Sequence, residues 1–494
     1  FSPTDSGSGK ELLKSASTAI TSVNGVYRSM WTAGWSTTAN THQCFGIAAY
    51  NLALDCMADD LIMQSQGNGW FWGDHCYNVK SNYTSSAFRS YDVWYANYKW
   101  IANVNYIIDA EPEMAGTEAD VAYVAGQAYA IRALCYLNLA TWFSRAPYNS
   151  LTGASRWNEP CVPVYTTGTS IDTGGQPRES LRTVYGRIDQ DIDRAIELLE
   201  KARETTLAEN NKSHINLYVA LGIKSRACLA EGDWDGAFKA AKRVIDEGGY
   251  AVGTKSDLTS GMNSLDKQNV MWGAGIQVAD QAGGYAGFFT HMDNKEGAYA
   301  KSAPKLISKQ LYNRISATDI RRDWWDPSDK ESPYVSKKFS FANVASSLGD
   351  YIYMRVEEMY FTAAEAALRL DDLKSARELM NTVMAERDPG YSANNRSGTL
   401  LGATTTTWTG SFLENILTHR RIELWGEYGR LFDVRRLGQG IDRRTDDGFS
   451  EECISMMNRR NVNITKADTY DWVLTIPKAE LDANPNINEE DQNP

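Results

Sequence analysis

The chain has 494 residues, of which 43% are apolar, so it can bury a sizeable core. Its 50 Lys and Arg residues against 62 Asp and Glu residues give a net charge of −12, which disfavours a protein that binds nucleic-acid phosphates. No apolar run is long enough to predict a membrane span, and seven scattered cysteines exclude a full disulfide framework.

The first half of the chain predicts long helices. Residues 92–109, 120–143 and 181–202 each place apolar side chains at helical spacing. The last of these segments is the most amphipathic, because Tyr185, Ile188, Ile192, Ile196 and Leu199 share one face. Residues 148–178 are rich in Pro, Gly and Thr and predict an irregular connection.

Two helix pairs repeat with an offset of 139 residues. Residues 215–230 and 234–246 form the first pair, and residues 354–370 and 373–385 form the second. Leu229, Asp233, Trp234 and Ala237 of the first correspond to Leu368, Asp372, Leu373 and Ala376 of the second. A short turn followed by a small residue at the helix contact is typical of tetratricopeptide-like hairpins.

The other segments are more varied. Residues 268–279 predict a short strand, and residues 311–326 predict short helix and turn. Residues 411–437 predict one long, densely charged helical stretch. The final segment, 484–494, is rich in Asn and acidic residues, so we expect it to be extended or frayed.

The aromatic residues suggest a ligand site. Trp70, Phe71 and Trp72 are consecutive and bracketed by glycines, so helical periodicity cannot point all three rings into one core. Flat rings can cover the C–H face of a sugar, and a carboxylate can accept hydrogen bonds from its hydroxyls. We therefore predict a ligand-binding set, with a buried aromatic corner as the alternative for each loop: Trp70, Phe71, Trp72, Asp74, Trp94, Tyr285, Phe289, His291 and Trp324.

No catalytic or cofactor motif is found. The chain lacks phosphate-binding, nucleophile-elbow and zinc-protease signatures, and its five histidines show no metal-site spacing, so we expect no cofactor and no metal. The adjacent carboxylates Asp59 and Asp60 diverge too much to act alone as a glycosidase pair. For the charges between Arg420 and Arg435 we favour ion pairs that fix helix packing over a catalytic site.

Several motifs resemble one family. The stretches RVEEMYFTAAEAALRL (355–370), ILTHRRIELWGEYGRLFDVRRLG (416–438) and IPKAELDANPNINEEDQNP (476–494) are similar to motifs of the SusD/RagB family, the glycan-binding lipoproteins of Bacteroidetes outer membranes. The resemblance spans residues 90–494. It implies a SusD-like, mostly α fold on a tetratricopeptide-like scaffold, no enzymatic activity, and a SusC-like TonB-dependent transporter as partner.

The resemblance also implies a cell-surface location. The family is anchored to the outer membrane through a lipidated cysteine after its signal peptide, whereas the first cysteine here is Cys44. We therefore expect the leader and the anchor to be missing from this chain.

Together these observations predict one SusD-like domain over 1–494. Residues 92–250 and 350–440 form the scaffold, and the ligand-face loops are residues 64–90 and 277–330. The predicted function is capture of an oligo- or polysaccharide and its transfer to the transporter. A helical glycoside hydrolase and a peptide-binding tetratricopeptide scaffold remain as alternatives.

Overall fold

The computed structural model describes residues 9–32, 40–78, 88–170, 172–209, 211–277, 286–467 and 469–494. The predicted mostly helical fold is confirmed. One hydrophobic core cluster runs through it, from Ala16 in the first long helix to Ile487 near the end of the chain. Among the described residues, no helix combines the length and the apolar character needed to cross a membrane.

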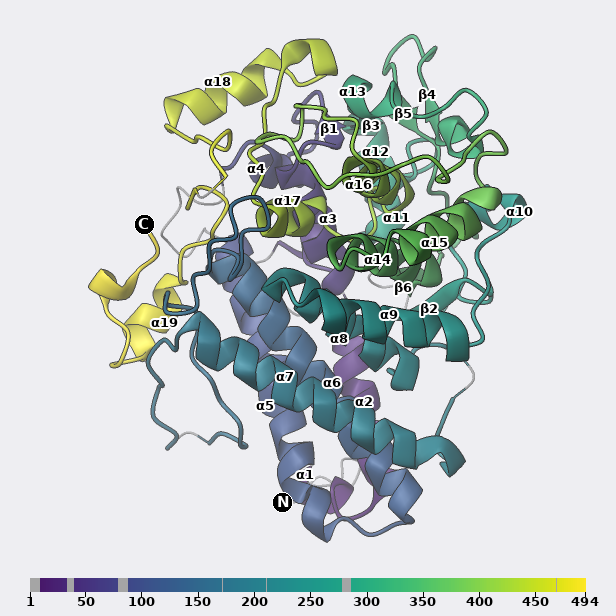
Figure 1. Cartoon of the computed structure of the whole chain (residues 1–494). Helices are drawn as coiled ribbons and strands as arrows, with labels where there is room; N and C mark the ends of the chain where they lie inside the picture. The colour runs from purple at the N-terminus through teal and green to yellow at the C-terminus, as the bar shows by residue number, and fades with distance from the viewer. Residues whose placement is uncertain are drawn as a thin grey trace.

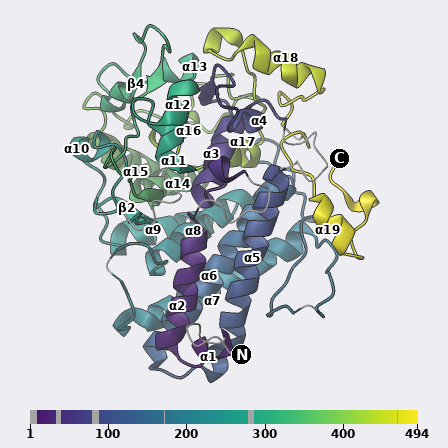
Figure 2. The same cartoon turned by 180° about the vertical axis from the view of Figure 1, so that it is seen from behind.

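Long helices from the first half of the chain lie side by side (Figures 1 and 2). Helix α6 is buried around most of its circumference, because it packs between α5 and α7. Thr117 and Ser180 cap α6 and α7, each accepting a hydrogen bond from a backbone N–H of the first turn. The helices up to this point are α1 (Gly9–Leu12), α2 (Ala16–Ser29), α3 (Ile47–Met57), α4 (Trp72–His75), α5 (Phe88–Ala110), α6 (Glu118–Phe143) and α7 (Leu181–Lys201).

The two predicted hairpins are confirmed as α8 (Leu217–Glu231) with α9 (Trp234–Glu247) and α14 (Val356–Arg369) with α15 (Leu373–Ala385). Their turns have the same conformation. Gly232 and the corresponding Asp371 are both left-handed, with φ of 76° and 62°. Asp233 and Asp372 then cap the second helix of each pair, accepting from N–H groups three residues later at 3.0 Å.

The predicted long helical stretch 411–437 is wrong. It is broken into α16 (Phe412–Glu423) and α17 (Arg430–Leu437). Gly426 and Gly429 lie between them with φ of 76° and 91°, a conformation that other residues rarely adopt. A Cβ atom at position 429 would also lie 3.0 Å from the Leu54 side chain, so glycine suits the close approach of α17 to α3.

Within the described part of the chain, six short strands form two antiparallel sheets. The four-stranded sheet has the order β1 (Leu61–Met63), β3 (Lys305–Ile307), β5 (Val335–Ser336), β4 (Trp325–Asp326). The predicted strand within 268–279 is confirmed as β2 (Val270–Ala274), which pairs with β6 (Tyr351–Arg355) in an irregular register. The remaining helices are short: α10 (Lys255–Leu258), α11 (Phe288–Met292), α12 (Ala298–Ser302), α13 (Lys309–Tyr312), α18 (Glu451–Arg459) and α19 (Lys478–Ala483).

Short 3-10 turns complete the secondary structure of the described residues. They are η1 (Thr41–Gln43), η3 (Glu111–Glu113), η4 (Ala202–Glu204), η6 (Ile320–Trp324), η7 (Thr445–Asp447) and η8 (Glu489–Asp491).

The last residues are held in place, contrary to the expectation of a frayed tail. The Asn493 side chain donates to the carbonyl oxygens of Phe143 and Leu474 at 2.9 and 2.8 Å. The side chain of Asn484 donates to the carbonyl oxygen of Gln176 at 2.9 Å. The asparagines that suggested disorder therefore attach this segment to the connection before α7 and to the end of α6.

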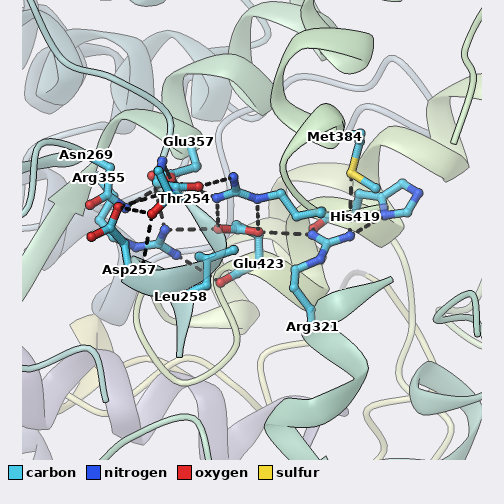
Figure 3. A network of polar contacts seen from close by, with 12 residues as sticks. Thr254, Asp257, Leu258, Asn269, Arg321, Arg355, Glu357, Met384, His419 and Glu423 are labelled. Carbon is cyan, nitrogen blue, oxygen red and sulfur yellow. Dashed lines mark hydrogen bonds and ion pairs between the residues drawn. The ribbon is translucent and has the colours of Figure 1, made fainter. Parts of the chain in front are cut away.

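Buried ion pairs join the C-terminal helices, as the sequence predicted (Figure 3). The carboxylate of Glu423 is bonded by Arg355 and Arg387 on one oxygen, at 3.0 and 2.8 Å, and by Arg321 on the other, at 3.1 Å. Although burial alone would raise it, the pKa of Glu423 is held well below its ordinary value by the guanidinium groups of Arg387 and Arg355. All four side chains are buried, so the network stabilises the packing of the segments that carry them.

Other arginines of this region are ion-paired in the same way, whereas Arg435 donates to the carbonyl oxygens of Thr141 and Ser144. Arg421 and Arg430 both bond Asp59 and Asp60. The adjacent acids are therefore ion-pair partners of α16 and α17 rather than groups open to a substrate.

Candidate functional site

The two predicted ligand-face loops come together in space. The ring of Phe71, from the first loop, and the ring of His291, from α11 in the second, have centroids 5.0 Å apart at 86°. Phe45, just before α3, stacks on His291 at 5.6 Å and meets Phe71 edge-on at 6.1 Å. This buried aromatic contact fixes one loop on the other.

Three half-buried rings lie next to this contact and form what we call the aromatic shelf: Trp70, His42 and Tyr299. Trp70 and His42 are stacked, with centroids 4.6 Å apart and planes 13° from parallel. Tyr299 meets both rings edge-on, at 6.1 and 5.5 Å. The Tyr299 hydroxyl also lies 2.5 Å from Nδ1 of His42, so the three rings hold one another in a fixed arrangement.

Buried groups behind the shelf determine its position. Nε2 of His291 lies 2.6 Å from the carbonyl oxygen of His42 and donates to it. Burial lowers the pKa of His291 well below its ordinary value, and the ammonium group of Lys305 adds to this, so the ring is neutral. The backbone N–H of Phe71, in a left-handed conformation, donates to Oε1 of Gln43 at 2.8 Å. The shelf is therefore preorganised.

Most of the predicted ligand-binding residues are not on the shelf. Trp70 is half-buried there, whereas the side chains of seven others are buried. These seven are Phe71, Trp72, Asp74, Trp94, Phe289, His291 and Trp324, and as ligand contacts they remain predictions. Tyr285 lies outside the described residues.

The reason for the burial differs from residue to residue. Both carboxylate oxygens of Asp74 are taken by Arg89, at 2.8 and 3.0 Å. The indole N–H of Trp324 donates to the carbonyl oxygen of Leu258 at 2.7 Å, and the ammonium group of Lys338 lies 4.5 Å from a Trp324 ring centroid. Phe289 packs among aromatic rings of the core. These partners are distant in sequence or invisible in a local pattern.

Trp94 belongs to a different place. It lines a half-open pocket of about 460 Å³, which we call the Trp94 pocket. The pocket lies between α5, the connection before α7, and α19. Its lining residues are Trp94, Tyr95, Tyr98, Lys99, Ile101, Ala102, Tyr165, Thr169, Ser170, Thr173 and Glu480.

The sequence interpretation missed several aromatic residues of both places. His42 and Tyr299 carry no local signal, because 257 residues separate them. Tyr95 and Tyr98 did carry one, because the row Tyr91, Tyr95, Tyr98 places rings at helical spacing on α5. Within the described ranges, no three His, Cys, Asp or Glu side chains are grouped so that they could hold a metal ion.

Comparisons with known proteins agree with the fold. Residues 289–494 match the family model described as "SusD family", and residues 23–229 match the model described as "Starch-binding associating with outer membrane". No curated protein matches the chain.

Solved structures match over nearly the whole chain. A SusD-like carbohydrate-binding protein from Bacteroides vulgatus is 25% identical, with a TM-score of 0.77, and the match covers 97% of this chain and 98% of that one. A SusD superfamily protein from Bacteroides thetaiotaomicron is 22% identical, with a TM-score of 0.75 and coverage of 97% and 100%.

A third structure is surface glycan-binding protein A from Bacteroides thetaiotaomicron in complex with laminarihexaose. It is 16% identical, with a TM-score of 0.65 and coverage of 97% and 99%. With family models matching both halves and the fold shared along its length, the chain belongs to the SusD/RagB family.

Proposed function

We propose that this protein is a non-enzymatic, cell-surface glycan-binding protein that captures an oligo- or polysaccharide on the aromatic shelf. The observation that carries the proposal is the half-buried indole of Trp70, stacked at 4.6 Å on His42 and flanked by Tyr299. An indole held in this way presents a large apolar area without losing side-chain entropy on binding. The family and the laminarihexaose complex of a structural relative support the same ligand class.

The shelf suits capture followed by release. Its contacts are ring stacking and hydrogen bonds to neutral hydroxyls, each of which contributes little, so a bound sugar can leave quickly. We infer that the captured glycan passes to a SusC-like TonB-dependent transporter in the outer membrane. The family to which the chain belongs and the outer-membrane association named for its N-terminal half support this inference. Attachment to the membrane would use a lipid anchor, as in the family.

The test of the shelf is Trp70→Ala in affinity gels cast with starch or laminarin, two glucans chosen from the comparisons. We expect the gels to retard the wild type, and the variant to migrate as it does in a gel without glycan. The matched control is Trp157→Ala, which removes another half-buried indole, one that meets Tyr185 edge-on at 5.8 Å. Unchanged retention of Trp70→Ala would contradict the proposal.

The same proteins discriminate between the function classes. New reducing ends on incubation with either glucan would identify a hydrolase, which we do not expect. Transfer to a transporter is tested by cross-linking in native outer membranes. The proposal predicts a TonB-dependent barrel as the cross-linked partner, and a protein cross-linked only to periplasmic or cytoplasmic proteins would contradict it.

A further inference from the structure

The Trp94 pocket is separate from the aromatic shelf. Helix α19, which forms one wall of the pocket, lies at the edge of the molecule in both views, away from α11 and α12, which support the shelf (Figures 1 and 2). The two places share no lining residue. A single monosaccharide cannot contact both, so any function of the pocket is separate from the shelf.

Aromatic rings gather around this pocket. Tyr91 and Tyr95 are stacked 5.6 Å apart with planes 9° from parallel. On the inner side, Trp94 and Tyr98 lie 4.9 Å apart, and Tyr98 meets Tyr165 edge-on at 5.9 Å. Four of these five rings line a space of about 460 Å³, within the range of about 300–1,000 Å³ typical of small-molecule sites.

These rings are fixed by hydrogen bonds at their polar ends. The hydroxyl of Tyr98 donates to the carbonyl oxygen of Pro163 at 2.7 Å, and that of Tyr165 accepts from the N–H of Gln176 at 3.0 Å. Burial raises the pKa of both tyrosines, so both hydroxyls stay protonated. The ring faces are therefore held in place before any ligand arrives, which reduces the entropy lost on binding.

Polar groups lie at the edge of the same space. The carboxylate of Glu480, half-buried, accepts from the indole N–H of Trp94 at 3.2 Å and from the Asn484 side chain at 2.8 Å. An ionised carboxylate has about four acceptor positions, so it can take sugar hydroxyls as well. The ammonium group of Lys99 lies 5.7 Å from the Tyr95 ring, and Ser170 and Thr173 add hydroxyl groups.

We propose that the Trp94 pocket is a second carbohydrate site, which binds one or two pyranose units of a neutral glycan. Aromatic faces beside a carboxylate and hydroxyl groups match a ligand with apolar C–H faces and a rim of hydroxyl donors. This inference rests on the proposed function for the identity of the ligand. Two sites on one protein would retain a long polysaccharide better than a short oligosaccharide, because the second contact is intramolecular when one chain reaches both.

The test is the stoichiometry of binding by isothermal titration calorimetry with laminarihexaose and with maltohexaose. We expect two sites per wild-type protein and one in Tyr95→Ala. The matched control is Tyr218→Ala, which removes a half-buried tyrosine of α8 outside the pocket and should leave two sites. Circular dichroism melts establish that each variant is folded.

The outcomes separate the two proposals. One site in the wild type that is lost in Trp70→Ala and unchanged in Tyr95→Ala would overturn the second site and leave the shelf intact. One site that is lost in Tyr95→Ala and unchanged in Trp70→Ala would support the pocket and overturn the shelf. If neither sugar binds the wild type at millimolar concentration, both proposals fail for these glucans.

Discussion

The ion-pair network around Glu423 and the aromatic shelf around Trp70 differ in how far their side chains are exposed to solvent. In the network, arginines bond both oxygens of a buried carboxylate, which is therefore closed to solvent. In the shelf, rings that could have been buried stay half-exposed on a rigid support. Residue type does not distinguish packing from function here. What distinguishes them is whether the side chain is already buried and bonded by its neighbours in the folded protein.

The largest effect should come from breaking the network. Glu423→Ala leaves the guanidinium groups of Arg355, Arg387 and Arg321 without their shared partner, which should cost about 3–5 kcal/mol of unfolding free energy. Urea unfolding followed by circular dichroism measures it. Glu197→Ala removes an exposed carboxylate paired with Arg194 and Lys201 on α7 and should leave the midpoint unchanged. Equal midpoints for both variants would contradict a packing role for Glu423.

Two neighbouring indoles make the comparison sharper. Trp72 is buried, with 4% of its surface exposed, whereas Trp70 is half-buried on the shelf. Trp72→Ala should therefore lower the unfolding free energy by about 3–5 kcal/mol. Trp70→Ala should lose glycan retention with a much smaller change in stability. Thermal melts and affinity gels on both variants measure the two quantities, and a destabilised Trp70→Ala with normal retention would reverse the assignment.

A third effect, which depends on pH, concerns a buried carboxylate close to two other acids. Burial, together with the charges of Asp189 and Asp233, raises the pKa of Glu231 from 4.5 to about 9. The folded protein thus holds a proton that the unfolded chain releases near pH 4.5. The stability from this group is complete below pH 4.5 and is lost as the pH rises through 9.

The variant Glu231→Gln tests the direction of this pH dependence. The wild-type melting temperature should fall from pH 6 to pH 9 more steeply than that of Glu231→Gln, whose amide cannot ionise. Differential scanning calorimetry across this range measures both. Parallel curves would show that Glu231 has the same pKa in the folded and the unfolded chain.

The sequence predicted those features that local patterns determine. The hairpin turns at Asp233 and Asp372 were predicted because a short turn, a small residue at the helix contact and helical periodicity lie within a few residues of each other. The break between α16 and α17 was missed, although Gly426 and Gly429 marked it, because the charged periodicity continues across them. Local patterns therefore predicted where the helices lie better than where they are interrupted.

The site depended on contacts that no local pattern contains. Asp74 was interpreted as a sugar ligand, since nothing near it in the sequence indicates that it pairs with Arg89, 15 residues away. A Gly-framed aromatic run does not reveal that Trp70 stays accessible while Trp72 packs inside. The family motifs compensated for this, because they identify the fold without any knowledge of which rings face solvent.

The hydrogen bond between Trp94 and Glu480 joins residues 386 positions apart. Closing a loop of this length costs more chain entropy than closing a short one, so we expect this contact to form late when the chain folds. The wall of the Trp94 pocket should therefore be among the last parts to gain protection in pulsed hydrogen exchange during refolding, after α5 and α6 are already protected. A folding intermediate would then have a nearly complete helical scaffold while this pocket is still open to water.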